Sequence, residues 1–209
     1  MHARARLDAH DAGKILFYIP AVDRPSTRLS QEHYEDMRAY PNISQSAKFP
    51  SVLPVFIGME MILSESVLPP TYVRGTACVV KGIELHPNEP AIDGRDSITT
   101  HGCVVLHYMP KFVYVHIKGS KDVFLQAPGV NIDDALTGVL AIAPKSRPWK
   151  YKPRGYKTDV CVTRTQVCLV PQKQCTLHGV QGKTADPGFI VHWTFPKALA
   201  PESRWLAHY

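Results

Sequence analysis

The sequence has no long apolar run, and only 20% of its residues are charged. Its most apolar stretch, residues 52–63, is interrupted by Pro54, Gly58 and Glu60. No segment therefore approaches the roughly 20 consecutive apolar residues of a membrane-spanning helix. The first residues are basic but lack the apolar core of a secretory signal. We therefore expect no contact with a membrane and no secretory leader.

The cysteines argue against a protein held by disulfide bonds and against a zinc-binding protein. Their number, five, is odd, and we expect an intracellular chain, so we expect reduced thiols rather than a disulfide framework. Zinc ligands usually come in pairs about two to four residues apart, whereas Cys161, Cys168 and Cys175 are spaced by seven. We expect no metal site, and we expect Cys161 and Cys168 to face a core as small apolar residues.

The chain contains enough apolar residues for a core, and its positive charge is concentrated in one segment. Its 209 residues suit one large or two small domains, and 44% of them are apolar. Residues 1–144 contain 13 basic and 15 acidic side chains, whereas residues 145–157 contain six basic and none acidic. The net charge of +6 therefore equals that of one short segment.

This basic segment, residues 145–157, also contains Trp149 and two tyrosines. Cations attract phosphates, and aromatic faces stack on unpaired bases. Lys150, Lys152, Arg154 and Trp149 are therefore candidate contacts to single-stranded DNA. The alternative is a solvated basic loop, kept irregular by two prolines and a glycine.

The spacing of apolar residues predicts mostly short strands. One helix is expected over residues 31–40, with Ser30 as its N-cap. Strands are expected at 14–19, on both sides of Gly58 within 53–63, and at 72–83, 103–108, 112–117, 159–170 and 189–194. Residues 84–101 are predicted to be a loop, and 109–111 a hairpin-like connection.

Common catalytic signatures are missing. The sequence has no G-x-S-x-G and no recognised Cys/His pattern. Its one G-K-[ST] run, at residues 182–184, does not complete a P-loop, because the required earlier glycine is Leu177.

Several motifs, in a fixed order, resemble RecD/Pif-type superfamily-one DNA helicases. Residues 164–171 read R-x-Q-x-x-L-x-P, and residues 176–184 read T-x-H-x-x-Q-G-x-T, which is similar to motif V of that family. Residues 53–63 resemble its G-M-x-V-x-L strand, and 73–80 resemble its N-G-T-x-G-x-V strand, with Arg74 where Asn is usual. The spacing and Pro-rich character resemble the Helitron subgroup. The alternative to a family resemblance is that Gly58, Gly75 and Gly82 are simply glycines of β-turns and bulges, which any small barrel can contain. The matching residues of the first two motifs are Arg164, Gln166, Leu169, Pro171, Thr176, His178, Gln181, Gly182 and Thr184.

The resemblance implies an α/β fold with a large β component, in which a partial second RecA-like domain of the P-loop NTPase type carries an SH3-like β-barrel insertion. Residues 1–50 would lead into the helicase region, and 51–126 would form the SH3-like insertion. Residues 127–158 would be a basic linker or loop, and 159–209 the partial RecA-like domain.

The resemblance also implies roles for the motif V residues. In this family the motif V loop contacts single-stranded DNA and couples it to the nucleotide site. By this resemblance, Thr176 and His178 contact DNA phosphate, whereas Gln181, Gly182 and Thr184 couple to the nucleotide.

The chain departs from the family where catalysis is concerned. The resemblance implies a parent helicase that uses ATP and Mg²⁺, but the phosphate-binding lysine would lie in a missing N-terminal RecA-like domain. The sequence also ends before the expected arginine-containing motif. We expect a helicase fragment that is not catalytically competent alone, with a nuclear location and a parent role in DNA repair or recombination. The alternative is a non-enzymatic β-rich nucleic-acid-binding or scaffold module.

Overall fold

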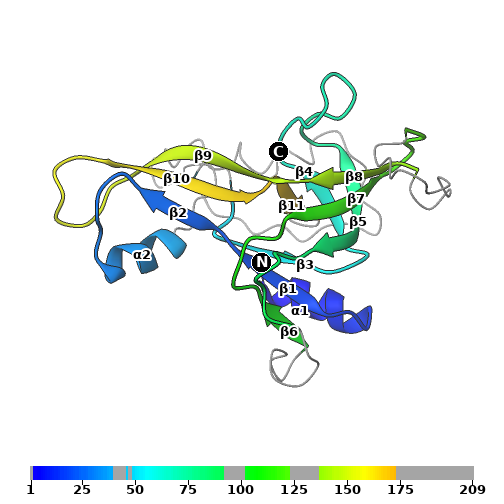
Figure 1. The fold of residues 1–209 in the computed structure, drawn as a ribbon, viewed down its shortest axis with the longest axis horizontal. Helices are drawn as coiled ribbons and strands as arrows, with labels where there is room; N and C mark the ends of the chain where they lie inside the picture. The colour runs from blue at the N-terminus through cyan, green and yellow to red at the C-terminus, as the bar shows by residue number, and fades with distance from the viewer. Residues whose placement is uncertain (1, 40–45, 47–48, 92–101, 123–136, 173–209) are drawn as a thin grey trace, which may run out of the picture. The chain divides into compact units, whose positions relative to one another are not determined.

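The computed structural model describes residues 2–39, 46, 49–91, 102–122 and 137–172 (Figure 1). In this part of the chain the helices are α1 (His2–Asp11) and α2 (Gln31–Arg38). The strands are β1 (Leu16–Pro20), β2 (Val22–Pro25), β3 (Val52–Val55), β4 (Glu60–Leu63), β5 (Ala77–Glu84), β6 (Cys103–Val105), β7 (Phe112–Ile117), β8 (Val139–Ile142), β9 (Pro144–Tyr151), β10 (Val160–Val167) and β11 (Leu169–Pro171). Neither of these helices is long and apolar enough to span a membrane.

These strands form three sheets. The first has the order β3-β1-β6, with β1 antiparallel to β3 and parallel to β6. The second has the order β2-β10-β9 and is antiparallel. We call it the hairpin sheet, because β9 and β10 form a long hairpin (Figure 1). The third is antiparallel with the order β11-β4-β5-β7-β8.

Single residues join the hairpin sheet to the other two sheets. Ala21 separates β1 from β2, Ala143 separates β8 from β9, and Cys168 separates β10 from β11. Each strand of the hairpin sheet is therefore nearly continuous with a strand of another sheet. The hairpin sheet is anchored at these three junctions, and two of them, at Ala143 and Cys168, belong to the hairpin itself.

Two of the N-terminal elements confirm the sequence prediction, whereas α1 and β2 were not predicted. The strand expected at 14–19 is β1, which begins at Leu16 and includes Pro20. The helix expected at 31–40 is α2, and the His33 amide donates to the Ser30 hydroxyl at 3.4 Å as expected for an N-cap. The helix ends at Arg38, and residue 40 lies outside the described part.

The glycines of residues 52–84 serve turns and a bulge. Gly58, between β3 and β4, and Gly75, before β5, have φ values of 97° and 95°, which side chains other than glycine rarely adopt. The pairing of β5 with β7 shifts register between Val80 and Gly82. The turn-and-bulge interpretation of these glycines is therefore confirmed, and β5 begins at Ala77, later than predicted.

The five-stranded sheet stays open among the described strands, with β11 and β8 at its two edges. The expectation of a β-rich fold with some helix is confirmed, but the described residues form no closed barrel. The sheet also includes residues from outside 51–126, because β8 and β11 belong to it. The SH3-like insertion stays a prediction.

The predicted hairpin around residues 109–111 is wrong. Strands β6 and β7 form where expected, but β6 pairs with β1 in the first sheet and β7 pairs with β5 and β8 in the third. The connection crosses between sheets, which short-range spacing does not reveal because two neighbouring strands need not pair with each other.

Two apolar clusters hold this part together. The larger lies between the first and third sheets and includes Leu16, Leu53, Met61 and Leu169, each at most 1% exposed. The smaller lies between the hairpin sheet and α2; its members are Leu29, Met37, Trp149, Tyr151, Val160 and Val162, with Tyr34 packed against them.

The chain divides into two compact units, residues 1–174 and 175–209. The described residues all belong to the first unit. Motif V at 176–184 and the predicted strand at 189–194 lie outside the described residues. The boundaries predicted from the sequence at residues 50, 126 and 158 stay predictions.

Candidate nucleic-acid interface

Most of the basic segment is a strand. Residues 145–151 belong to β9, which pairs with β10 from Pro144↔Val167 to Tyr151↔Val160. The prediction of a linker or loop is therefore wrong for these residues. Pro148 has no N–H to donate to a neighbouring strand. It is tolerated because β9 is an edge strand of its sheet, so one side of its backbone needs no partner strand.

Alternation along β9 divides its side chains between two faces. Trp149 and Tyr151 point to the inner face, toward α2, and are 5% and 3% exposed. Burial corrects the expectation that Trp149 stacks on DNA bases, because its ring is already packed in the smaller cluster. The spacing of two between these aromatics is the signal for a half-buried strand.

Two cations of the segment are paired with one carboxylate. Glu65, whose side chain is 10% exposed, lies 2.5 Å from Arg147 Nε and 3.9 Å from Lys145 Nζ, measured to its carboxylate oxygens. Both cations share the inner face with Trp149 because they are two and four residues before it. Sequence analysis missed Glu65, which lies far from the segment along the chain.

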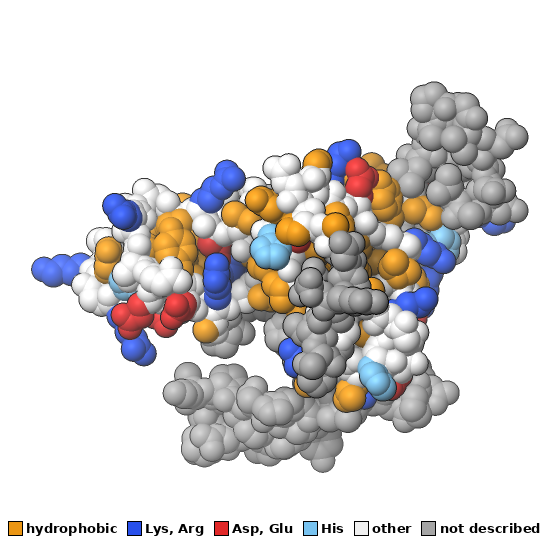
Figure 2. All heavy atoms as spheres, turned by 60° about the horizontal axis from the view of Figure 1, so that its bottom comes forward, with side chains coloured by type: hydrophobic (Ala, Val, Ile, Leu, Met, Phe, Trp, Pro, Cys, Tyr) orange, Lys and Arg blue, Asp and Glu red, His pale blue; other side chains and the backbone are white. Residues whose placement is uncertain are grey.

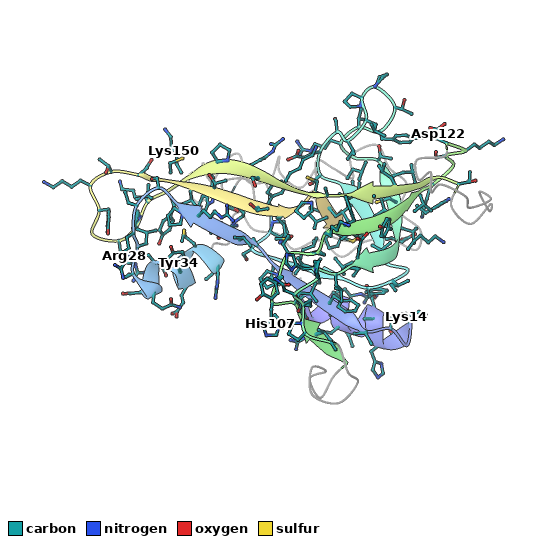
Figure 3. The ribbon with its side chains drawn as sticks, viewed as in Figure 1. Lys14, Arg28, Tyr34, His107, Asp122 and Lys150 are labelled. Atoms are coloured by element: carbon teal, nitrogen blue, oxygen red, sulfur yellow. The ribbon has the colours of Figure 1, made fainter. Side chains whose placement is uncertain are left out.

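The other four cations of the segment, Lys150, Lys152, Arg154 and Lys157, are exposed. In the part of the chain that the structure describes, no carboxylate forms an ion pair with them. Lys150 points away from the side of the sheet where Tyr34 of α2 lies (Figure 3). The structure thus leaves the predicted contacts Lys150, Lys152 and Arg154 accessible.

Helix α2 supports the loop that joins β9 and β10. His33 Nε2 lies 3.3 Å from the Arg154 carbonyl oxygen, and the His33 ring meets Tyr156 edge-on, with centroids 5.4 Å apart. Tyr156 is 41% exposed, so it is the one aromatic side chain of the segment open to a ligand. At the hairpin, Figure 2 shows Asp and Glu side chains gathered on the α2 side, with Lys and Arg spread around them.

Arg164 of β10 fixes the inner face of the hairpin sheet. Its side chain is fully buried and forms a two-pronged pair with Asp23 of β2, with both N–O distances 2.8 Å. It also donates to the carbonyl oxygens of Met37 at 3.0 Å and Phe49 at 3.3 Å. Its guanidinium carbon lies 5.0 Å from the centre of the Trp149 ring. The first residue of the R-x-Q motif is therefore a structural cross-link in this chain.

Gln166, the second residue of that motif, joins the hairpin sheet to the first sheet. Its amide nitrogen donates to the carbonyl oxygens of Ile19 at 3.0 Å and Pro50 at 3.3 Å. Its amide oxygen accepts from the Val167 backbone at 2.9 Å. Every polar atom of this buried side chain is used, so it is positioned to hold the base of the hairpin.

The motif V residues Thr176, His178, Gln181, Gly182 and Thr184 lie outside the described residues. Their predicted roles stay predictions. Within the described ranges, no three His, Cys, Asp or Glu side chains are grouped as metal ligands would be.

The cysteines differ in their surroundings. Burial raises the pKa of the Cys78 thiol to about 12 and that of Cys168 to about 11, so both stay protonated at neutral pH. Cys168 is buried as expected. Cys161 is exposed, so its predicted core position is wrong: it lies on the face of β10 opposite Val160 and Val162.

No family model and no curated protein matches the sequence. Among solved structures, the chain is similar to the crystal structure of Pif1 helicase from Candida albicans at 15% identity and a TM-score of 0.46, over 87% of this chain and 35% of that one. It is similar to unliganded Pif1 from Bacteroides sp at 12% identity and a TM-score of 0.42, over 82% and 37%. A structure described as two coordinating Pif1 helicases at forked double-stranded DNA matches at 10% identity and a TM-score of 0.42, over 87% and 28%. The chain thus spans little more than a third of these helicases at most, and TM-scores of this size do not establish a common fold.

Proposed function

We propose that this chain binds single-stranded DNA through its basic hairpin, as one part of an ATP-dependent DNA helicase of the RecD/Pif type. The observation that supports DNA binding is the group of four exposed cations, Lys150, Lys152, Arg154 and Lys157, on a hairpin whose opposite face is packed. Because β9 and β10 pair along their whole length and continue into strands of the third sheet, the backbone that presents these cations needs little ordering when it meets a strand of phosphates.

The helicase part of the proposal rests on the sequence motifs. Thr176 and His178 would add phosphate contacts, while Gln181, Gly182 and Thr184 would face the nucleotide. The finer assignments to the Helitron subgroup and to an SH3-like insertion over 51–126 have the same basis.

The chain's own residues do not fit the ATP and Mg²⁺ that such a helicase uses. The sequence has no complete P-loop, and the described residues offer no grouped metal ligands. We derive no step through these groups, and we assign them to an N-terminal RecA-like domain that acts with this chain as its partner.

Neutralising three cations of the hairpin tests the DNA-binding part. A labelled oligo-dT strand is titrated with the chain at several salt concentrations, and binding is followed by fluorescence anisotropy. For the variant with Lys150, Lys152 and Arg154 all changed to Gln, we expect weaker binding to every DNA sequence. The slope of log K against log salt should fall in magnitude by about 2, at about 0.7 for each lost contact to a single strand.

A matched variant controls for net charge. Lys14, Arg74 and Lys81 are exposed cations outside the hairpin sheet, and changing all three to Gln removes the same charge. We expect the salt slope of this control to equal that of the original chain. Equal slopes for the hairpin variant and the control would refute the assignment, and so would a folded chain that binds no DNA.

The non-enzymatic module is supported by one observation: the four exposed cations belong to residues 150–157 and include no residue of the motif V sequence. The two proposals differ in nucleotide coupling. DNA affinity that changes with a non-hydrolysable ATP analogue, after the missing domain is supplied, would favour the helicase, and unchanged affinity would favour the module.

A further inference from the structure

The hairpin sheet has an outer face that no motif singled out. Residues directly opposite each other in antiparallel strands share a face. The register pairs Arg24 of β2 with Thr163 of β10, and Thr163 with Pro148 of β9. It also pairs Cys161 with Lys150. The outer face therefore comprises Val22, Arg24, Ser146, Pro148, Lys150, Cys161, Thr163 and Thr165.

The chemistry of this face differs sharply from that of the inner one. Arg24, Ser146 and Lys150 are exposed, and Thr163 and Thr165 are partly exposed. Within the three described strands, no carboxylate lies on this face, because Asp23 points inward to Arg164. The face thus offers two cations beside three hydroxyl groups, without acidic groups to repel an anion.

The hydroxyl groups lie close enough to act together. Ser146 Oγ and Thr165 Oγ1 are 2.7 Å apart, and Thr163 lies two residues along the same strand on the same side. Hydroxyls donate to phosphate oxygens and read no base sequence. The aromatic rings of the two strands, Trp149 and Tyr151, are buried on the other face, so this surface offers no ring on which a base could stack.

We propose that the phosphodiester backbone of single-stranded DNA crosses this outer face on its way to the cationic β9–β10 loop. Arg24 then provides a fifth phosphate contact from a distant part of the sequence, and Thr163 and Thr165 provide neutral ones. The proposal rests on the proposed DNA-binding function, and it adds the path of the strand and the kind of contact. Binding on this face depends on the backbone and not on the bases.

Cys161 supplies a native reporter of the path. It is exposed, and it lies directly opposite Lys150, whereas Cys78, Cys103 and Cys168 are buried. The full chain is alkylated with a maleimide, with and without saturating oligo-dT, and the modified peptides are quantified by mass spectrometry. We expect bound DNA to slow modification of Cys161 severalfold. An unchanged rate at saturation overturns the proposal.

Substitutions give an independent test by anisotropy with the same oligo-dT. Arg24→Gln should lower the magnitude of the salt slope by about 0.7, while Lys81→Gln on β5 leaves it unchanged. The double variant Thr163→Val and Thr165→Val keeps β-branched shape and should weaken binding by about fivefold without changing the slope. With the Tyr156→Leu variant, which removes the exposed ring of the β9–β10 loop, an abasic strand of equal length should bind as the oligo-dT does.

The outcomes separate this proposal from the proposed function. Normal binding by the Arg24 and threonine variants, together with loss of binding in the hairpin triple variant, overturns the path across the outer face and leaves the hairpin as the DNA site. Much weaker binding of the abasic strand overturns backbone recognition. A folded chain that does not bind DNA at all overturns both.

Discussion

Replacing Arg164 by Met removes the charge that holds β2, β10 and α2 together, while keeping a long side chain in the core. Arg164 is 0% exposed, and its partner Asp23 is 7% exposed in its side chain. Their two short hydrogen bonds cross from β10 to β2, and two more bonds reach the backbone carbonyls of Met37 and Phe49. The substitution leaves the buried Asp23 carboxylate without its cation and removes one hydrogen bond from each of the two carbonyl groups.

The expected loss is large relative to the stability of a domain. Removing one partner of a buried ion pair costs about 3–5 kcal/mol, because the other charge is left unpaired. A domain of this kind is stable by about 5–15 kcal/mol in total. Arg164→Met should therefore remove about a fifth or more of the free energy of unfolding. Because the Met37 carbonyl lies at the C-terminal end of α2, the helix should lose support first.

Urea unfolding followed by circular dichroism and Trp fluorescence measures this loss. A double-mutant cycle with Asp23→Leu assigns it to the pair: the double variant should be more stable than the sum of the single losses predicts, by at least about 1 kcal/mol. The double variant will not recover fully, because the carbonyl oxygens of Met37 and Phe49 have each lost the hydrogen bond from Arg164. A loss below about 1 kcal/mol for Arg164→Met, or a cycle that shows no coupling, would refute the cross-link.

Three smaller predictions follow from other parts of the structure. Ser30→Ala should cost about 1 kcal/mol in the same unfolding assay, because the first turn of α2 loses its cap; an unchanged midpoint would contradict the cap. Hydrogen bonds from Lys111, which has the larger effect, and from Tyr114 lower the pKa of the Glu84 carboxyl. The ionised Glu84 carboxylate therefore stabilises the fold above the ordinary pKa of Glu, and this stabilisation is lost as the pH falls through the lowered pKa. The difference in unfolding free energy between the original chain and Glu84→Gln should therefore shrink in acid. Because burial raises the pKa of the thiols of Cys78 and Cys168 to about 12 and 11, neither should react with maleimide at pH 8 in the folded chain, in contrast to the exposed thiol of β10.

Local signals predicted the elements that depend on local physics. Ser30 as an N-cap before residues 31–40 indicated α2, because an N-cap acts within one turn. Alternation of apolar and polar residues indicated β10, and glycines with positive φ marked the turns before β4 and β5. Each of these features is decided within a few residues.

Features that depend on distant residues could not be predicted in this way. The prolines and charges of β9 look like a loop until its partner β10 and its position at a sheet edge are known. Arg164 and Asp23 are 141 positions apart, so nothing in the R-x-Q motif indicates an ion pair. The single-residue junction at Cys168 also hides a change of sheet, because β10 and β11 read as one run over residues 159–170.

Because residues 145–151 form a strand and not a free loop, the expected salt dependence of DNA binding changes. Six free cations in residues 145–157 would give a salt slope near −4, at about 0.7 for each contact to a single strand. Glu65 pairs with two of them, which leaves four and lowers the expected slope to about −3. Arg24 on the outer face would bring it to about −3.5. Lys145 and Arg147 lie on the inner face beside Trp149, opposite the proposed path of the DNA. Glu65→Gln should therefore release both cations and leave the slope unchanged. A slope that steepens toward the value for six free cations plus Arg24 would contradict the path across the outer face.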